Sequence, residues 1–325
     1  MSPTRRAPDA DRAAPGRFPP DLLYRAARMY YLEDANQAEV AEALGTSRPT
    51  VSRLLAEARA QGIVHIEVRE PQPDRTAELG QQLGTQLGLT RCWVTPAVGE
   101  RRTGSVLAPA VGEALSAAGL RSGDALLVSS GATVHGIAQH ELTALPGVLV
   151  APVVGGTDEP EEYYQTNEIT RQVAARVGGV PQFLYAPAMP GADLHPILTS
   201  DPTTRRVTDL WSRARAAVLG IGAPPSTRTS LPSVLPGGSS RLATAVGDIC
   251  SRPYDEDGVP LEFPGSERLI AMRLEDLRRI PAAIGVAVGA VKVAGILAAV
   301  RAGYVTQLVT DEPTASALLA AAQRD

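Results

Sequence analysis

Cysteine and histidine are scarce in this sequence. Only Cys92 and Cys250 occur among 325 residues, and they offer neither a zinc-binding spacing nor a disulfide framework. The histidines also lack a metal-binding spacing; they are His65, His135, His140 and His195. We therefore expect no metal and no cofactor, and the low cysteine content is typical of a protein in a reducing cytosol.

Long apolar runs are also missing. The chain contains no stretch of about 18 apolar residues, the length that a membrane-spanning helix requires. Its first residues carry no apolar segment of the kind found in signal peptides. We expect a cytoplasmic protein that makes no use of a membrane.

Aromatic residues are few, and the chain has no excess of positive charge. Aromatics make up 4% and apolar residues 44%, so a substantial core must be built mainly from aliphatic side chains. The net charge of −4 excludes a nucleic-acid binder coated with basic residues, but not one with a local basic face. The length favours two domains, or one large domain and a small module.

Lysine occurs once. Of 31 basic residues, Lys292 is the only lysine, and the others are arginines. Arginine serves in most surface roles of lysine, so the remaining lysine is a candidate for a role that needs a compact ammonium group. Chance is the alternative explanation.

The segment Asn36–Gly62 has the pattern of a helix-turn-helix. Asn36 is placed to cap a first helix, and Gly45 follows it where a left-handed residue is needed. Ser47 is placed to cap a second helix, with Pro49 in its first turn. Two short helices joined by a glycine turn are typical of DNA-binding modules.

Polar residues gather near the start of the second helix, away from its apolar stripe. Hydroxyl and guanidinium groups in this position are typical of a recognition helix. The candidate DNA-contacting residues are Gln37, Ser47, Arg48, Thr50, Ser52 and Arg53. An ordinary helical hairpin with a solvated face would show the same periodicity, but the run of Ser, Arg and Thr favours DNA.

The charge around this module is balanced. Residues 1–70 contain ten arginines and ten acidic residues. A neutral module should bind double-stranded operator DNA weakly as a monomer. We therefore expect a homo-oligomer whose copies bind repeated half-sites.

The segments around the helix-turn-helix set its limits. Residues 1–20 are rich in Arg, Ala, Pro and Asp and predict a disordered arm. A supporting helix is expected over Asp21–Leu32, and a short strand over Ile63–Val68. The DNA-binding domain then covers residues 21–70, and an effector-binding and oligomerisation domain covers residues 71–325.

Strands and helices alternate through the second domain. The expected strands are nearly all apolar, which is typical of strands buried on both faces. They are Cys92–Thr95, Ala125–Ser129, Val148–Val153, Phe183–Ala186, Ala217–Ile221, Ile284–Val288 and Gln307–Thr310. Helices are expected between most of them, whereas Pro224–Asp257 reads as loops. The fold class is therefore α/β: a small all-α helix-turn-helix domain, followed by a doubly wound, mostly parallel α/β domain.

Ligands of open α/β sheets bind outside the carboxyl ends of the strands. Two loops in this position connect a strand to a helix through small residues. One is Ser130-Gly131-Ala132-Thr133, and the other ends at Lys292. Free amides at a helix start suit an anion, and a lysine can neutralise a phosphate. The pair of loops predicts a pocket for a sugar phosphate or a polyol, although any βα turn favours such residues.

Further polar residues follow other strands. Gln165 and Asn167 have amides that suit sugar hydroxyls, or they are simply polar residues at a helix start. Asp248 and Asp255 offer carboxylates, although the sequence around Asp255 is also typical of a turn.

The sequence resembles the SorC family of bacterial sugar-responsive transcription regulators along nearly its whole length. The motifs that carry the resemblance are Gln37–Ala41, Ser47–Leu55, Gly62–Val64, Ser130–Val134, Gly247–Ile249, Tyr254–Gly258, Gly285–Lys292 and Thr310–Glu312.

The resemblance implies a homotetrameric repressor or activator with an inducer-binding domain related in fold to sugar-phosphate isomerases. By motif position, the residues expected to contact a phosphorylated sugar are Thr133, Gln165, Asp248 and Lys292. Val154 stands where some bisphosphate-binding members have arginine, which favours a monophosphate, a free sugar or a polyol. The alternative function is a sugar-phosphate isomerase or deaminase with an appended module. We expect no enzyme, because no second acid or base group completes a catalytic set.

Overall fold

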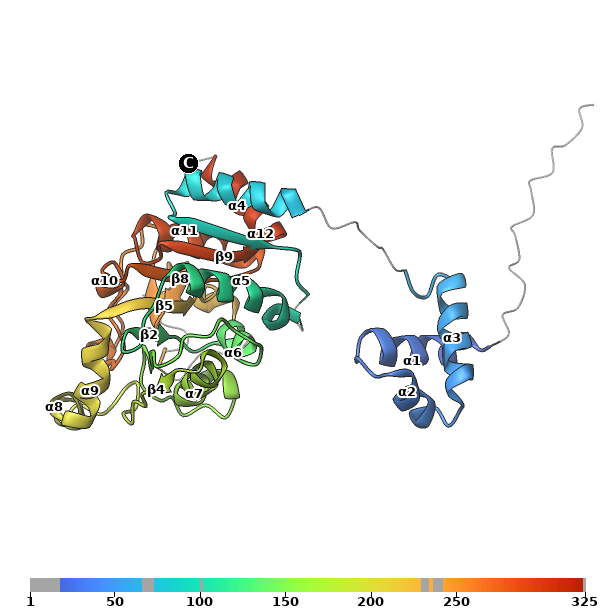
Figure 1. Cartoon of the computed structure of the whole chain (residues 1–325), viewed down its shortest axis with the longest axis horizontal. Helices are drawn as coiled ribbons and strands as arrows, with labels where there is room; N and C mark the ends of the chain where they lie inside the picture. The colour runs from blue at the N-terminus through green and yellow to red at the C-terminus, as the bar shows by residue number, and fades with distance from the viewer. Residues whose placement is uncertain (1–17, 66–72, 100–101, 229–233, 236–241, 324–325) are drawn as a thin grey trace, which may run out of the picture. The chain divides into compact units, whose positions relative to one another are not determined.

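The computed structural model describes residues 18–65, 73–99, 102–228, 234–235 and 242–323 (Figure 1). It divides into two units, Met1–Pro71 and Gln72–Asp325. Nearly all of the arm predicted over residues 1–20 lies outside the described residues. Among the described helices, none is both long and apolar enough to cross a membrane.

The N-terminal unit contains three helices, α1 (Pro20–Tyr31), α2 (Gln37–Ala43) and α3 (Arg48–Ala60). Asn36 caps α2 in a reciprocal capping box with Glu39. Gly45 has φ 60°, and the Ser47 hydroxyl accepts from the Thr50 amide. The helix-turn-helix boundaries predicted from these caps are confirmed. The buried residues between the helices are Leu23, Ala26, Ala27, Val40, Ala41, Val51, Leu54, Leu55 and Ala58.

The strand predicted over Ile63–Val68 is wrong for its described part. Residues 63 and 64 form a bend, residue 65 belongs to no strand, and residues 66–68 lie outside the described residues. The Val64 amide donates to the Ala58 carbonyl at 3.1 Å, and both Ile63 and Val64 pack against the three-helix core. These apolar residues close the end of α3 rather than pair with a strand.

A seven-stranded sheet forms the centre of the C-terminal unit, and all its neighbouring strands are parallel. The strand order is β1-β9-β8-β5-β2-β3-β4. The strands are β1 (Arg91–Thr95), β2 (Ala125–Val128), β3 (Leu149–Pro152), β4 (Val180–Pro181), β5 (Ala214–Gly220), β8 (Ala282–Val286) and β9 (Gln307–Asp311). This order confirms the predicted doubly wound α/β sheet.

Helices cover both faces of the sheet (Figure 1). One face is covered by α5 (Thr103–Ala117), α6 (Ala132–Ala138) and α7 (Thr166–Val177). The other is covered by α4 (Pro73–Leu87), α9 (Pro202–Trp211), α10 (Leu274–Leu277), α11 (Val293–Arg301) and α12 (Glu312–Ala322). Successive strand residues join opposite layers, as with Leu126 and Leu127 of β2.

Two segments differ from the predicted elements. The strand expected over Phe183–Ala186 is absent; β4 lies earlier, and Leu184 is held instead by the Asn167 side chain. The short helix α8 (Leu194–Ser200) follows. The segment expected to be loops contains a hairpin of β6 (Gly247–Ile249) and β7 (Arg252–Tyr254).

Candidate functional site

A cleft of about 390 Å³ lies beyond the carboxyl ends of β2 and β5. Loops after β2, β5 and β8, together with the β6–β7 hairpin, contribute its walls. The lining residues are Ser129, Ser130, Gly131, Ala132, Thr133, Val134, Tyr163, Tyr164, Gly220, Ile221, Gly222, Ala223, Thr227, Arg228, Asp248, Cys250, Ser251 and Lys292. Six of the nine residues predicted to bind an effector are among them: Ser130, Gly131, Ala132, Thr133, Asp248 and Lys292.

The loop after β2 is fixed by hydrogen bonds to its neighbours. The Gly220 amide of β5 donates to Ser129 Oγ at 2.8 Å, and the Gly131 amide donates to the Tyr163 carbonyl at 2.7 Å. Gly131 has φ 118°, a conformation open to glycine. This turn places Ala132 and Thr133 in the first turn of α6, against the cleft.

Lys292 enters the cleft from the loop after β8. It ends a short 3₁₀ turn, Ala290–Lys292, which begins after Gly289 at φ 109°. The Gly289 amide donates to Thr314 Oγ1 at 2.7 Å, and this bond holds the loop on α12. Burial and the nearby Arg228 guanidinium lower the pKa of Lys292 to about 8. An anion in the cleft would offset both unfavourable effects.

Asp248 and Arg228 form an ion pair in the cleft wall. The Arg228 guanidinium donates to the buried Asp248 carboxylate from Nη2, and to the Ala223 carbonyl from Nε at 2.8 Å. Burial lowers the pKa of Arg228, but an arginine stays charged. The pair is neutral as a whole, and Lys292 forms no ion pair with the described residues, so Lys292 supplies the net positive charge of the cleft lining.

Gly222 leaves room for this ion pair. Its amide donates to the Asp248 carbonyl at 2.9 Å, and a Cβ atom at this position would overlap both Arg228 and Asp248 side chains. The ion pair between Arg228 and Asp248 therefore requires a glycine at position 222, just after β5.

Three predicted effector residues lie outside the cleft lining. Gln165 donates its amide to the Glu159 carbonyl, and Asn167 exchanges two hydrogen bonds with the backbone of Leu184. The Asp255 carboxylate accepts from the amides of residues 257 and 259 and so closes its own turn. Backbone groups engage these side chains, so the structure does not bring them to the site.

The sequence missed Arg228 and the two tyrosines of the cleft. Arg228 lies in a segment without periodicity, and only the fold brings it to Asp248. Tyr163 and Tyr164 precede α7 in a short 3₁₀ turn, and their rings contact each other with centroids 4.6 Å apart. The Tyr163 carbonyl accepts the hydrogen bond from the Gly131 amide. The two loops meet only in the folded chain, so the sequence of either loop alone does not indicate that the tyrosines line the cleft.

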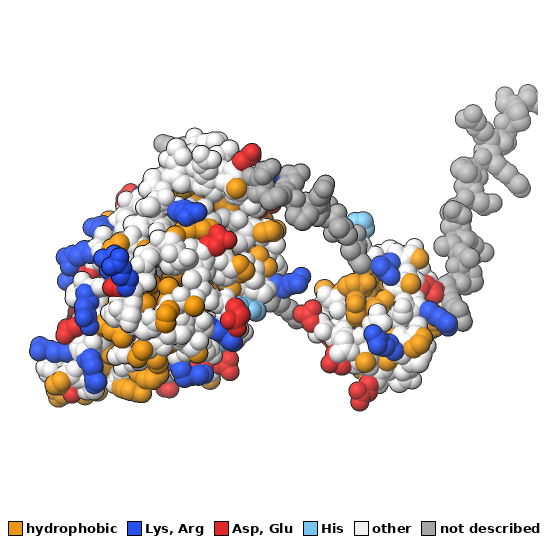
Figure 2. Space-filling model, viewed as in Figure 1, with side chains coloured by type: hydrophobic (Ala, Val, Ile, Leu, Met, Phe, Trp, Pro, Cys, Tyr) orange, Lys and Arg blue, Asp and Glu red, His pale blue; other side chains and the backbone are white. Residues whose placement is uncertain are grey.

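The predicted DNA-contacting residues lie on α2 and α3. Ser47, Arg48, Ser52 and Arg53 are exposed, whereas Gln37 and Thr50 are half-buried. Ser47 and Thr50 bond each other through their hydroxyls at 2.8 Å, so both also serve the cap of α3. Figure 2 shows basic and acidic side chains interspersed on the visible face of this unit, in agreement with its balanced charge.

Comparison with known families agrees with both units. Residues 72–320 match the family model of a sugar-binding domain, and residues 28–61 match region 4 of sigma-70. The sorbitol operon regulator of Klebsiella pneumoniae is 30% identical over 92% of this chain and 97% of its own. The chain belongs to the SorC family.

Other SorC-family relatives support the same assignment. The deoxyribonucleoside regulator of Bacillus subtilis (strain 168) is 31% identical over 92% of this chain and 97% of its own. The crystal structure of the full-length Klebsiella pneumoniae regulator matches with a TM-score of 0.69, covering 92% of this chain and 98% of that one. These relatives are transcription regulators, and none of them supports the alternative of an isomerase or deaminase. The protein is a DNA-binding transcriptional regulator with a sugar-binding domain.

Proposed function

We propose that this regulator represses genes of carbohydrate metabolism and is released from its operator by a small effector. The effector is a sugar, a polyol or a sugar monophosphate bound in the cleft around Lys292. The observation that carries the proposal is the position of this single lysine, half-buried opposite the loop that begins α6. A half-buried cation opposite the start of a helix favours an anionic or strongly polar ligand.

Two parts of the cleft lining suit two different chemical groups of the ligand. Lys292 and the amides at the start of α6 suit one phosphate group. The Arg228–Asp248 pair offers both donors and acceptors, which suit hydroxyl groups. Val154 is buried and forms an isolated β-bridge with Ala271, so that position provides no cation for a second phosphate.

The operator-reading surface we propose is the exposed start of α3. Arg48 and Arg53 make no ion pair with the described residues, so both guanidinium groups can contact phosphates or bases. Gln37, Ser47, Thr50 and Ser52 would assist them. The module has no net positive charge, so useful affinity requires a homo-oligomer, a dimer or a tetramer, in which two modules bind adjacent half-sites. Because operator DNA lies in the cytoplasm of a bacterium, we expect the protein to act there.

Thermal-shift screening of sugars, polyols and their phosphates tests the cleft, because a ligand that binds only the folded state raises its stability. We expect a phosphorylated or polyhydroxylated compound to raise Tm, and Lys292→Gln to abolish that rise. Arg206→Gln is the matched control, since Arg206 is exposed on α9 outside the cleft lining. An unchanged shift in Lys292→Gln would refute the placement of the ligand.

Gel-shift titration with DNA upstream of the regulated gene tests the output. We expect a salt-sensitive complex that the compound found by thermal shift dissociates. Lys292→Gln should bind this DNA normally and fail to release it. A complex that no polyol or phosphate dissociates would contradict gating, and the absence of any specific complex would contradict the regulator itself.

A further inference from the structure

The two edges of the seven-stranded sheet differ. At one edge, β4 has two residues and ends with Pro181, which cannot donate to a further strand. At the other edge, β1 has five residues and no proline, and it pairs with β9 on one side only. Its residues Trp93, Val94 and Thr95 have side chains that favour strands. Among the described strands, none pairs with the open side of β1.

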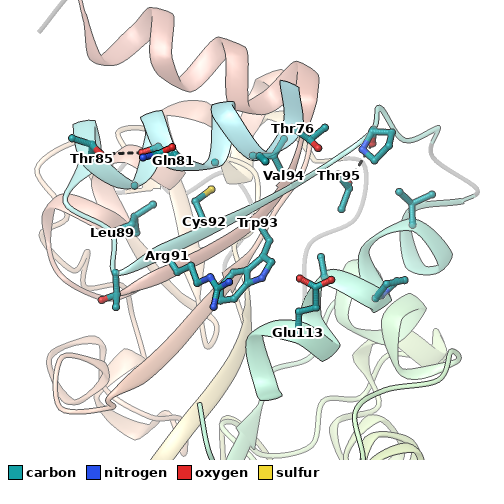
Figure 3. Close-up of a pocket in the computed structure, with 18 residues that line it drawn as sticks. Thr76, Gln81, Thr85, Leu89, Arg91, Cys92, Trp93, Val94, Thr95 and Glu113 are labelled. Atoms are coloured by element: carbon teal, nitrogen blue, oxygen red, sulfur yellow. Dashed lines mark hydrogen bonds between the residues drawn. The ribbon is translucent and has the colours of Figure 1, made fainter. Parts of the chain in front are cut away.

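A groove of about 820 Å³ follows this open edge (Figure 3). Small residues on the flanking helices line it. They include Gly80 and Gly84 of α4 and Ala110 of α5. At Gly80 the helix comes so close to β1 that a Cβ atom would lie 2.6 Å from the Cys92 carbonyl oxygen.

The two faces of β1 belong to different layers. Cys92 and Val94 pack on the side of α4, and Trp93 packs on the side of α5. The Trp93 indole N–H is buried and has no acceptor among the described residues. A buried donor without an acceptor is costly, so the site lacks a group that a partner would supply.

Opposite charges border the groove on the α5 side. Arg91 is exposed, with its guanidinium carbon 5.0 Å from the centroid of the Trp93 ring. Glu113 of α5 is exposed as well, and Figure 3 shows it beside Trp93 on the same side of β1. Among the described residues, neither Arg91 nor Glu113 forms an ion pair. Each is therefore available to a charge of opposite sign.

We propose that this groove is an interface between two copies of the chain, in which their β1 strands pair antiparallel about a two-fold axis at Trp93. A two-fold interface uses the same surface on both copies, so a strand edge can meet itself only in the antiparallel direction. Arg91 of one copy then approaches Glu113 of the other, twice by symmetry. The fourteen strands of the two sheets become one continuous sheet across the axis.

This interface deepens the proposed function, on which its biological purpose rests, because it identifies the surface that joins two neutral DNA-binding modules. Its own support comes from the C-terminal unit alone. The association can be measured without DNA and without effector, so a failure of DNA binding leaves it standing.

Sedimentation equilibrium of the full chain tests the charge contacts. We expect Arg91→Glu and Glu113→Arg each to halve the mass of the assembly, because each places two like-charge pairs across the axis. The double variant Arg91→Glu/Glu113→Arg should restore the mass. Arg206→Glu on α9 is the matched control and should leave it unchanged. A monomeric wild-type chain, single variants of unchanged mass, or a double variant that stays dissociated would overturn the proposal.

Cross-linking tests the strand register separately. With Trp93 on the axis, Cys92 of one copy lies opposite Val94 of the other on the α4 side. We expect Val94→Cys to give a disulfide-linked dimer under mild oxidation, and Cys92→Ser/Val94→Cys to give none. A Val94→Cys chain that stays uncross-linked would overturn the pairing of the strands. Assembly only with an added extended peptide would show a different occupant and would also overturn it.

Discussion

Replacing Lys292 with methionine should stabilise the effector-free protein. The pKa of Lys292 is lowered from 10.5 to about 8, chiefly by burial, so the charged form is less favourable in the folded state than in the unfolded one. A difference of this size corresponds to about 3 kcal/mol at most. Lys292 retains partial exposure, and solvent screening reduces the expected gain to about 2 kcal/mol. Methionine keeps the length of the side chain and removes its charge.

The pH dependence gives the prediction its sign. Below about pH 8 the lysine is protonated in both states, and the full cost of its charge lowers the stability of the wild type. Between about pH 8 and 10.5 the folded state has lost this proton and the unfolded state retains it, so wild-type stability rises with pH. The advantage of Lys292→Met should therefore be complete near neutral pH and should vanish toward pH 10.5.

Thermal unfolding at a series of pH values measures this difference directly. We expect a rise in Tm of about 4 °C near neutral pH for a gain of this size. A phosphorylated effector should then raise the Tm of the wild type and not that of the variant. The reasoning is refuted if Lys292→Met is less stable than the wild type near neutral pH, or if their difference does not change between about pH 7 and 10.

Three further substitutions test other parts of the chain. Gly222→Ala should separate Arg228 from Asp248, lower the free energy of unfolding by about 3 kcal/mol and abolish effector binding; normal binding by calorimetry would contradict the assigned cleft wall. Asn36→Ala should cost the N-terminal unit about 1 kcal/mol by removing the α2 cap, as unfolding monitored by circular dichroism would detect. Arg53→Ala should weaken operator binding about tenfold and reduce its salt dependence, with melting unchanged. Equal affinity of the Arg53→Ala and wild-type proteins in a gel-shift titration would remove Arg53 from the DNA-reading surface.

The helix-turn-helix could be predicted because its signals are local. Asn36, Gly45 and Ser47 each act on a backbone group within a few residues, so their spacing alone sets the helix boundaries. The prediction of a strand after Gly62 was wrong because it depended on contacts that are not local. The sequence of residues 63–68 alternates between apolar and polar side chains as in a strand, but Ile63 and Val64 pack against the core of the preceding helices.

The candidate cleft was predictable only in part. Thr133 and Lys292 follow buried strands, and parallel strands bring their carboxyl ends to one edge of the sheet, so sequence position was sufficient. Gln165 and Asn167 also follow a strand, but their amides satisfy backbone carbonyls nearby. Nothing in a sequence shows whether an amide side chain is already engaged.

The sequence by itself determined the periodic elements, their order, the parallel α/β class and the caps of the DNA-binding helices. Those features depend on contacts within a few residues, or on the alternation of buried strands and helices. The tertiary structure alone decided that Arg228 pairs with Asp248, that Gly222 makes room for them, and that β1 ends the sheet with an open groove. These features depend on which segments, far apart in the sequence, come into contact in the folded chain. The spacing of residues within one segment does not indicate those contacts.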